Sequence, residues 1–133
     1  MIMDHKLKLM VVDDSPLFRT WLIRSLSEDD RFQVVGYAVN ALDAQEKIPL
    51  LQPDMLTLDI EMPGMSGIEF LKQLLPVHPI PVILVSSLNL RVFDALEAGA
   101  VDFVRKPDEA NGLSKEIFLS MLRSKLMVAA ASH

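Results

Sequence analysis

The chain has 133 residues, of which 50% are hydrophobic and 23% are charged, with a formal net charge of −5 and no cysteine. This length supports one ordinary core, and the composition excludes a disordered chain. The negative charge argues against direct binding of nucleic acid or membrane, and the lack of cysteine excludes disulfides and thiolate sites and favours a cytoplasmic setting.

The first elements alternate between strand and helix. The apolar run at 7–12 predicts a buried strand that ends abruptly at two acidic residues. Ser15 followed by Pro16 predicts a helix start, because a capping hydroxyl precedes a ring whose φ suits the first helical position. A second strand is predicted at 32–37.

The middle of the chain repeats this order. Asn40 is expected to cap a short helix that Pro49 closes, and the run 55–58 predicts a third strand. The segment 61–67 contains one proline and two glycines, which predicts a loop. Apolar residues at helical spacing over 68–75 then indicate a third helix.

The last third of the chain completes the pattern. A fourth strand is predicted at 81–85, a fourth helix at 92–99 and a fifth strand at 102–105. A final helix is expected to begin near Ser114. Five strands, each followed by a helix, predict an α/β fold of the (βα)5 type. Its five-stranded sheet is parallel and doubly wound, flavodoxin-like, with strand order 2-1-3-4-5.

Polar side chains follow the predicted strands at their carboxyl ends. They are Asp13 and Asp14 after the first strand, Asp59 after the third, Ser86 after the fourth and Lys106 after the fifth. In a doubly wound sheet these ends share one edge, so the side chains are expected to converge. Three nearby carboxylates stay ionised only beside a cation, and an all-oxygen ligand set suits Mg2+. Phosphoryl transfer also needs a nucleophile and cations, which Asp59 and Lys106 supply, while Ser86 can donate a hydrogen bond.

Each of these residues, taken alone, has an ordinary structural explanation. Asp13 and Asp14 favour a helix N-terminus through its dipole, and Asp59 before a Pro/Gly loop is commonly a turn residue. Ser86 alone carries almost no signal, and Lys106 before a proline is compatible with a solvated side chain. The combination in this order, with each residue at a strand end, is far more specific than any member.

These residues lie in segments that resemble a known family. Met10–Pro16, Leu58–Gly67, Val82–Ser87 and Ala98–Pro107 are similar to the receiver domains of two-component response regulators. The resemblance extends from about Leu7 to the last helix, so a single receiver domain is expected over residues 1–133.

The resemblance implies a role for each residue at this edge. Asp59 is the implied phospho-acceptor; Asp14, Asp59 and the backbone carbonyl of Glu61 are implied Mg2+ ligands, with Asp13 reaching the ion through water. Ser86 and Lys106 are expected to hold the phosphoryl oxygens, and Phe103 is the aromatic switch residue whose position follows Ser86. The family also implies a cis Lys106–Pro107 bond, which X-Pro sequences adopt at modest cost.

The resemblance further implies partners. A sensor histidine kinase is the expected phosphoryl donor, and an output domain or target protein is expected to read the surface of the fourth helix, fifth strand and fifth helix. Homodimerisation is left open. The segments at 58–63, 85–88 and 99–104 look most like the regulatory domain of chemotaxis protein-glutamate methylesterases. No catalytic domain follows the fifth helix, so the chain is not expected to be an independent enzyme, although a longer parent methylesterase fits the resemblance.

Three other functions remain open from the residues alone. A Mg2+-dependent enzyme acting on an external phosphoester would need a substrate pocket or cap domain, for which the chain has no spare residues. A flavin-binding module would need a phosphate-binding loop after the first strand, where the two acidic residues would repel phosphate. An interaction domain that is never phosphorylated would normally lack the acidic pair or the lysine.

Overall fold

Five parallel strands form one sheet in the order β2-β1-β3-β4-β5, as predicted. The computed structural model describes residues 6–62, 64–87, 91–108 and 113–132. The strands are β1 (Leu7–Val12), β2 (Phe32–Ala38), β3 (Met55–Leu58), β4 (Val82–Ser86) and β5 (Asp102–Arg105). The helices are α1 (Pro16–Ser27), α2 (Ala41–Leu51), α3 (Gly67–Leu74), α4 (Arg91–Glu97) and α5 (Lys115–Ser132).

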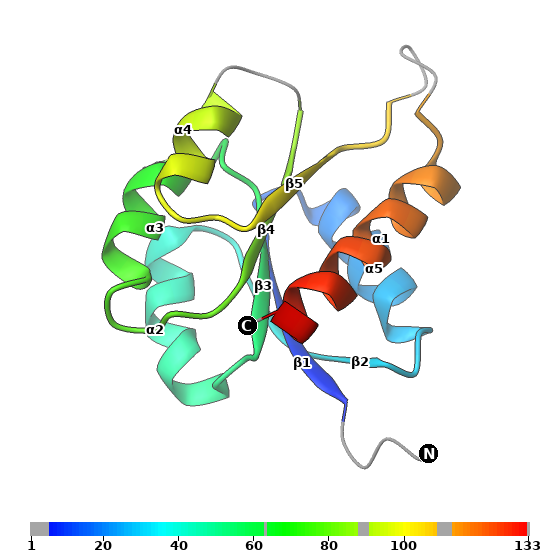
Figure 1. Ribbon diagram of the computed structural model, residues 1–133, viewed down its shortest axis with the longest axis horizontal. Helices are drawn as coiled ribbons and strands as arrows, with labels where there is room; N and C mark the ends of the chain where they lie inside the picture. The colour runs from blue at the N-terminus through cyan, green and yellow to red at the C-terminus, as the bar shows by residue number, and fades with distance from the viewer. Residues whose placement is uncertain (1–5, 63, 88–90, 109–112, 133) are drawn as a thin grey trace.

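The sheet separates two hydrophobic clusters. Figure 1 shows α2, α3 and α4 on one side of the sheet and α1 and α5 on the other. Side chains of alternate residues in β1 pack on opposite faces of the sheet. Leu9 and Val11 belong to the cluster under α1 and α5, whereas Met10 and Val12 belong to the cluster under α2, α3 and α4. All four side chains are buried, which explains the continuous apolar run of this strand.

Short hydroxyl and amide side chains cap the starts of α1, α2, α3 and α5, where Ser114 accepts the backbone N–H of Ile117. Ser15 caps α1, Asn40 caps α2 and Ser66 caps α3, and each side chain accepts a hydrogen bond from a backbone N–H in the first turn. Pro16 occupies the first turn of α1. The caps of α1 and α2 lie within three residues of the strands before them and so fix where these helices leave the carboxyl ends of β1 and β2.

Two predicted helix boundaries are wrong. Pro49 does not close α2, which continues to Leu51 and ends at Gln52 with φ +48°. A proline in the last turn forfeits a single helical hydrogen bond, and Leu51 packs against the core in return. Gly99 lies beyond α4 with φ +117°, a left-handed conformation that suits glycine and ends the helical segment.

The edge strand β2 carries an irregularity in its pairing with β1. Leu9 pairs with Val34, but Met10 pairs with Gly36, so Val35 is left without a partner on β1. The ladder resumes with Val11 opposite Tyr37. An extra residue of this kind bends a strand and increases its local twist.

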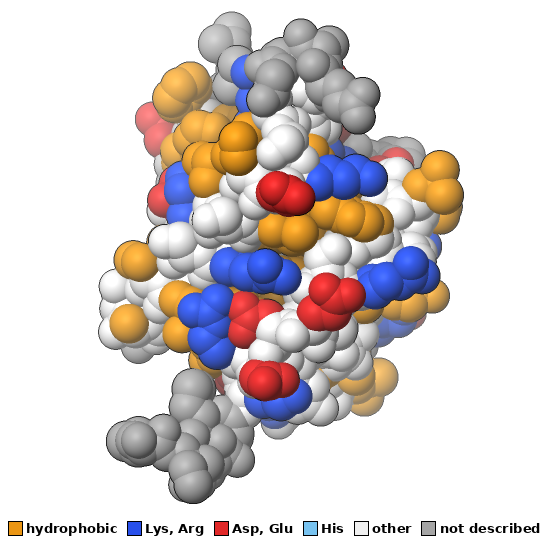
Figure 2. Space-filling view, turned by 90° about the vertical axis from the view of Figure 1, so that its right-hand side faces the viewer, with side chains coloured by type: hydrophobic (Ala, Val, Ile, Leu, Met, Phe, Trp, Pro, Cys, Tyr) orange, Lys and Arg blue, Asp and Glu red, His pale blue; other side chains and the backbone are white. Residues whose placement is uncertain are grey.

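The outer surface over α1 and α5 is mixed in character. Figure 2 shows this side of the molecule, where acidic and basic side chains lie among apolar ones. In the part of the chain that the structure describes, no helix has the length and apolar character needed to cross a bilayer.

Candidate functional site: an acidic cluster with a buried lysine

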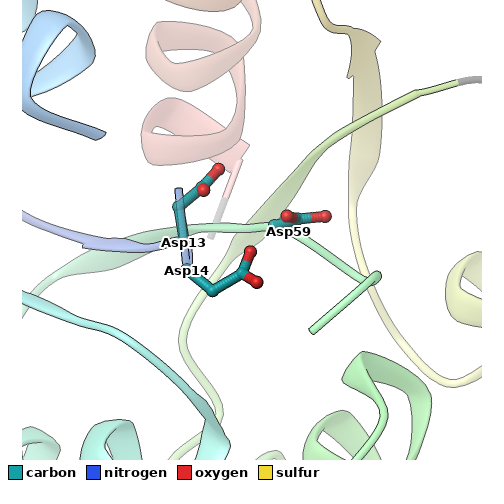
Figure 3. A group of neighbouring side chains, drawn as sticks. All are labelled: Asp13, Asp14 and Asp59. Carbon is teal, nitrogen blue, oxygen red and sulfur yellow. The ribbon is translucent and has the colours of Figure 1, made fainter. Parts of the chain in front are cut away.

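Three aspartates meet at the carboxyl ends of β1 and β3. These strands are hydrogen-bonded neighbours with Val12 opposite Leu58, so the residues that follow them are adjacent. Asp13, Asp14 and Asp59 each offer a carboxylate oxygen, and these oxygens all lie within 4.8 Å of one another. Figure 3 shows the side chains of Asp13 and Asp14 leaving the end of β1 in different directions, with Asp59 beside them.

Asp13 is fixed by the start of α1. Its side chain is buried, and its Oδ1 accepts a hydrogen bond of 2.8 Å from the backbone N–H of Ser15. Its backbone carbonyl accepts a second bond, also of 2.8 Å, from the Arg19 guanidinium. Asp14 is exposed to solvent, so the cluster has one open side.

Asp59 is held between β1 and the loop that follows β3. Its backbone N–H donates to the carbonyl of Val12, and its Oδ1 accepts a 2.9 Å hydrogen bond from the backbone N–H of Glu61. The residue is only 5% exposed. The second oxygen, Oδ2, faces Lys106 at 3.3 Å.

Lys106 joins two of the three carboxylates. Its Nζ lies 3.1 Å from Oδ2 of Asp13 and 3.3 Å from Oδ2 of Asp59. Its backbone N–H donates to the carbonyl of Ser86 at the end of β4, which fixes the root of the side chain. The residues that directly follow β1, β3 and β5 therefore meet at one edge of the sheet.

Burial and charge shift the protonation of this cluster in defined directions. Burial raises the pKa of the Asp59 carboxyl to about 6, although the Glu61 hydrogen bond and Lys106 act to lower it. Burial alone would lower the pKa of Lys106, but the carboxylates of Asp59 and Asp13 outweigh it and raise that pKa. The lysine is therefore a fixed cation, while Asp59 can exchange a proton near neutral pH.

The expected cis bond before Pro107 is wrong. The described residues contain no cis peptide bond, so Lys106 and Pro107 are joined in the trans form, which X-Pro bonds favour slightly. Lys106 nevertheless reaches both carboxylates from the trans backbone.

The remaining predicted residues lie around the cluster in different ways. Ser86 is the last residue of β4 rather than the first after it; it is buried, and its hydroxyl donates to the carbonyl of Ser87. Glu61 contributes the backbone N–H described above. Phe103 lies on β5, partly buried against the cluster under α2, α3 and α4, with the ammonium of Lys125 5.4 Å from its ring.

Two residues that contact the site, Phe18 and Arg19, are not among the site residues predicted from the sequence. Phe18 places its ring 4.6 Å from Nζ of Lys106, and Arg19 holds the carbonyl of Asp13. Helical periodicity marks Phe18 as a residue of the buried face, which is correct but says nothing of a lysine 88 positions later. The contact depends on the packing of α1 against α5 and on the position of β5 in the sheet, which no local sequence pattern predicts.

The donor set fits a hard divalent cation. The three carboxylates supply oxygen ligands only, and the exposed side at Asp14 leaves room for the water molecules that Mg2+ retains. Mutual repulsion of the carboxylates would be relieved by such an ion, because Lys106 provides only a single positive charge. The cluster can therefore hold a metal ion.

Comparisons with known proteins agree with this geometry. Residues 9–118 match the response regulator receiver domain family. The chain is 47% identical over 129 residues to a protein-glutamate methylesterase/protein-glutamine glutaminase of Syntrophomonas wolfei subsp. wolfei, covering 97% of this chain and 38% of that protein. It is 44% identical over 136 residues to a protein of the same name from Vibrio vulnificus, covering 99% of this chain and 39% of the relative.

A solved structure shows the same likeness in three dimensions. The response regulator domain of Thermotoga maritima CheB superposes with a TM-score of 0.83 and 37% identity, over 96% of this chain and 98% of that domain. The chain spans about two fifths of the length of the curated relatives named above. With the fold, the strand-end aspartates and the family match in agreement, the chain belongs to the response regulator receiver domain family of two-component systems.

Proposed function

We propose that the chain is a phosphorylation switch in which Asp59 accepts a phosphoryl group from a sensor histidine kinase. The observation that supports this most directly is the buried Asp59 carboxylate with the Lys106 ammonium 3.3 Å away. In the transfer, an oxygen of Asp59 forms a bond to phosphorus while the phosphorus–nitrogen bond of the donor phosphohistidine breaks. The donor nitrogen keeps the electron pair and returns to a neutral imidazole after proton exchange.

The residues around Asp59 have separate tasks in this proposal. Lys106, whose ammonium is permanently charged, neutralises the transferred phosphoryl oxygens, and Ser86 turns its hydroxyl from the Ser87 carbonyl to one of them. Asp14, Asp59 and the carbonyl of Glu61 would hold Mg2+, with Asp13 acting through water. When bound, Mg2+ supplies positive charge that draws the donor phosphate to the carboxylate.

Phosphorylation would be signalled to partners through a shift between two conformations of the protein surface. Phosphorylation at Asp59 would favour one of two arrangements of Ser86 and Phe103, and through them of the surface formed by α4, β5 and α5. An output domain or target protein would read that surface. We propose further that residues 1–133 form one receiver domain and act in the cytoplasm.

The relatives suggest the process that is controlled. Since the similar proteins from Syntrophomonas wolfei and Vibrio vulnificus are protein-glutamate methylesterases, we propose that this domain regulates such an enzyme in a longer parent. A coding sequence after His133 that lacks any esterase domain would contradict this part of the proposal.

Intact mass spectrometry tests the phosphorylation step. The protein is incubated with Mg2+ and phosphoramidate, a small donor with the same phosphorus–nitrogen bond as phosphohistidine. One phosphoryl adduct is expected on the wild type and none on Asp59→Asn. The matched control is Asp54→Asn, because Asp54 precedes β3 at the opposite end of that strand, where its carboxylate accepts from the Lys8 backbone N–H. An adduct that persists in Asp59→Asn would overturn the proposal.

A further inference from the structure

The ammonium of Lys106 has a third neighbour besides the two carboxylates. Its Nζ lies 4.6 Å from the centroid of the Phe18 ring, which sits in the first turn of α1. An aromatic face carries negative charge density and attracts a cation at this distance. The side chain of Lys106 is only 20% exposed, so solvent weakens this attraction little.

The Phe18 ring is itself firmly held. Its centroid lies 5.7 Å from that of Trp21 and 5.9 Å from that of Phe118, in an edge-on arrangement with the latter. Phe118 lies on α5 and is fully buried. The Ser15 hydroxyl that caps α1 accepts a hydrogen bond from the backbone N–H of Phe18, which holds the backbone of Phe18. The ring itself has one aromatic neighbour on α1 and one on α5.

The ring differs from the carboxylates in that its attraction for the ammonium does not depend on the state of Asp59. During phosphoryl transfer one oxygen of Asp59 becomes bonded to phosphorus, and a bound divalent cation would compete for Asp13 and Asp59. Both events weaken the ion pairs that hold Lys106 in the resting protein. The face of Phe18 is held by Trp21 and Phe118 rather than by Asp59, so it would still limit the positions that the flexible four-carbon side chain of Lys106 can sample.

We propose that Phe18 is a positioning residue for Asp59 phosphorylation, holding the Lys106 ammonium beside the acceptor carboxylate through its aromatic face. This inference rests on the proposed function, because it assigns Lys106 to the phosphoryl group. It predicts that an aromatic ring, and not simply apolar volume, is required at position 18.

The rate of phosphorylation by phosphoramidate at saturating Mg2+ tests this requirement. Phe18→Leu should slow the reaction about three- to tenfold, whereas Phe18→Tyr, which keeps the ring, should stay within about twofold of the wild type. The control is Phe32→Leu, the same exchange at a fully buried ring of the same hydrophobic cluster, at the start of β2. That variant should lose stability without slowing the reaction.

The outcomes separate this inference from the proposed function. Equal rates for Phe18→Leu and wild type, or equal slowing in Phe18→Tyr or Phe32→Leu, would overturn the role of the ring while leaving phosphorylation intact. No adduct on the wild type would overturn the proposed function instead.

A second measurement needs no phosphorylation. The side-chain methylene protons of Lys106 nearest its ammonium should show an upfield ring-current shift in NMR spectra of the wild type and of Phe18→Tyr. The shift should vanish in Phe18→Leu, and its absence from the wild type would contradict the contact itself.

Discussion

The Asp59 carboxyl is buried, faces a lysine and has a pKa raised to about 6. A divalent cation binds the ionised form of a carboxyl group and therefore competes with its proton. Below about pH 6, part of the binding energy of Mg2+ must go into removing that proton from Asp59. Lys106 reduces this cost because it lowers the pKa of Asp59, but that pKa is still above the ordinary value of 3.8.

We therefore expect the affinity for Mg2+ to rise with pH up to about pH 6 and to level off above it. Isothermal titration calorimetry between pH 5 and pH 8 would measure the change, which should approach about tenfold per pH unit on the acidic side. Asp59→Asn serves as the control, since it lacks the titrating group. A pH dependence that is identical in wild type and Asp59→Asn would show that another residue is responsible.

Individual site residues differ in how far the sequence reveals them. Asp13, Asp14, Asp59 and Lys106 stand at the ends of predicted strands, and parallel strands bring such positions together, so their convergence follows from the sequence alone. The contact between Phe18 and Lys106 joins the first and last thirds of the chain and depends on packing between α1 and α5. Periodicity identifies a buried face, but it does not identify which distant side chain lies against it.

At the scale of elements, the loop after β3 is shaped by a close approach of backbones. A Cβ atom added to Gly67 would lie 2.7 Å from Cα of Ile60. The backbone N–H of Gly67 also donates to the carbonyl of Ile60. Ile60 directly follows Asp59 and is buried. The start of α3 therefore constrains the segment that carries Asp59.

Gly67→Ala is expected to destabilise the protein by about 1–3 kcal/mol, because backbone atoms on both sides must separate. The reaction of Asp59 with phosphoramidate should also slow as its loop shifts. Urea unfolding and the rate of adduct formation would measure the two effects. The comparison variant is Gly36→Ala, whose new methyl group meets only the end of the flexible Leu51 side chain and should cost less. Equal losses in the two variants would argue against the backbone contact.

The boundaries of elements were less predictable than their order. Helix starts carry a chemical mark, such as Ser15, Asn40 or Ser66, whose side chains accept from the first turn. Helix ends are marked less clearly: α2 continues past Pro49 because Leu51 gains core packing, whereas α4 ends before Gly99, whose left-handed conformation stops the helix. The five strands and their parallel order follow from apolar runs separated by helical segments.

For the whole molecule, the raised pKa of Asp59 makes stability depend on pH. Its pKa is about 6 in the folded protein against 3.8 for an ordinary aspartate, so folding favours the protonated form. The stability that this proton contributes is fully present below about pH 4 and is lost as pH rises through about 6. The whole loss amounts to about 3 kcal/mol in the absence of metal.

We therefore expect the free energy of unfolding of Asp59→Asn to fall by about 2 kcal/mol less than that of the wild type between pH 4 and pH 7 in metal-free buffer. Urea unfolding followed by the fluorescence of Trp21, the only tryptophan, would give both curves. Taking the difference between the two proteins removes the contribution of titrating groups that do not interact with Asp59. Parallel plots of unfolding free energy against pH for the two proteins would refute the assignment of the raised pKa to Asp59. Added Mg2+ should reduce the pH dependence of the wild type.

The unpaired Val35 in β2 also bears on how this molecule avoids aggregation. An edge strand offers its free hydrogen-bonding groups to the strands of other chains, and a regular ladder is the best template for such growth. Here the one-residue shift between Val34 and Gly36 interrupts the spacing of those groups halfway along the edge. A strand from another chain could pair in register with one half of β2 but not with the other. We therefore expect the irregularity to disfavour edge-to-edge association through β2.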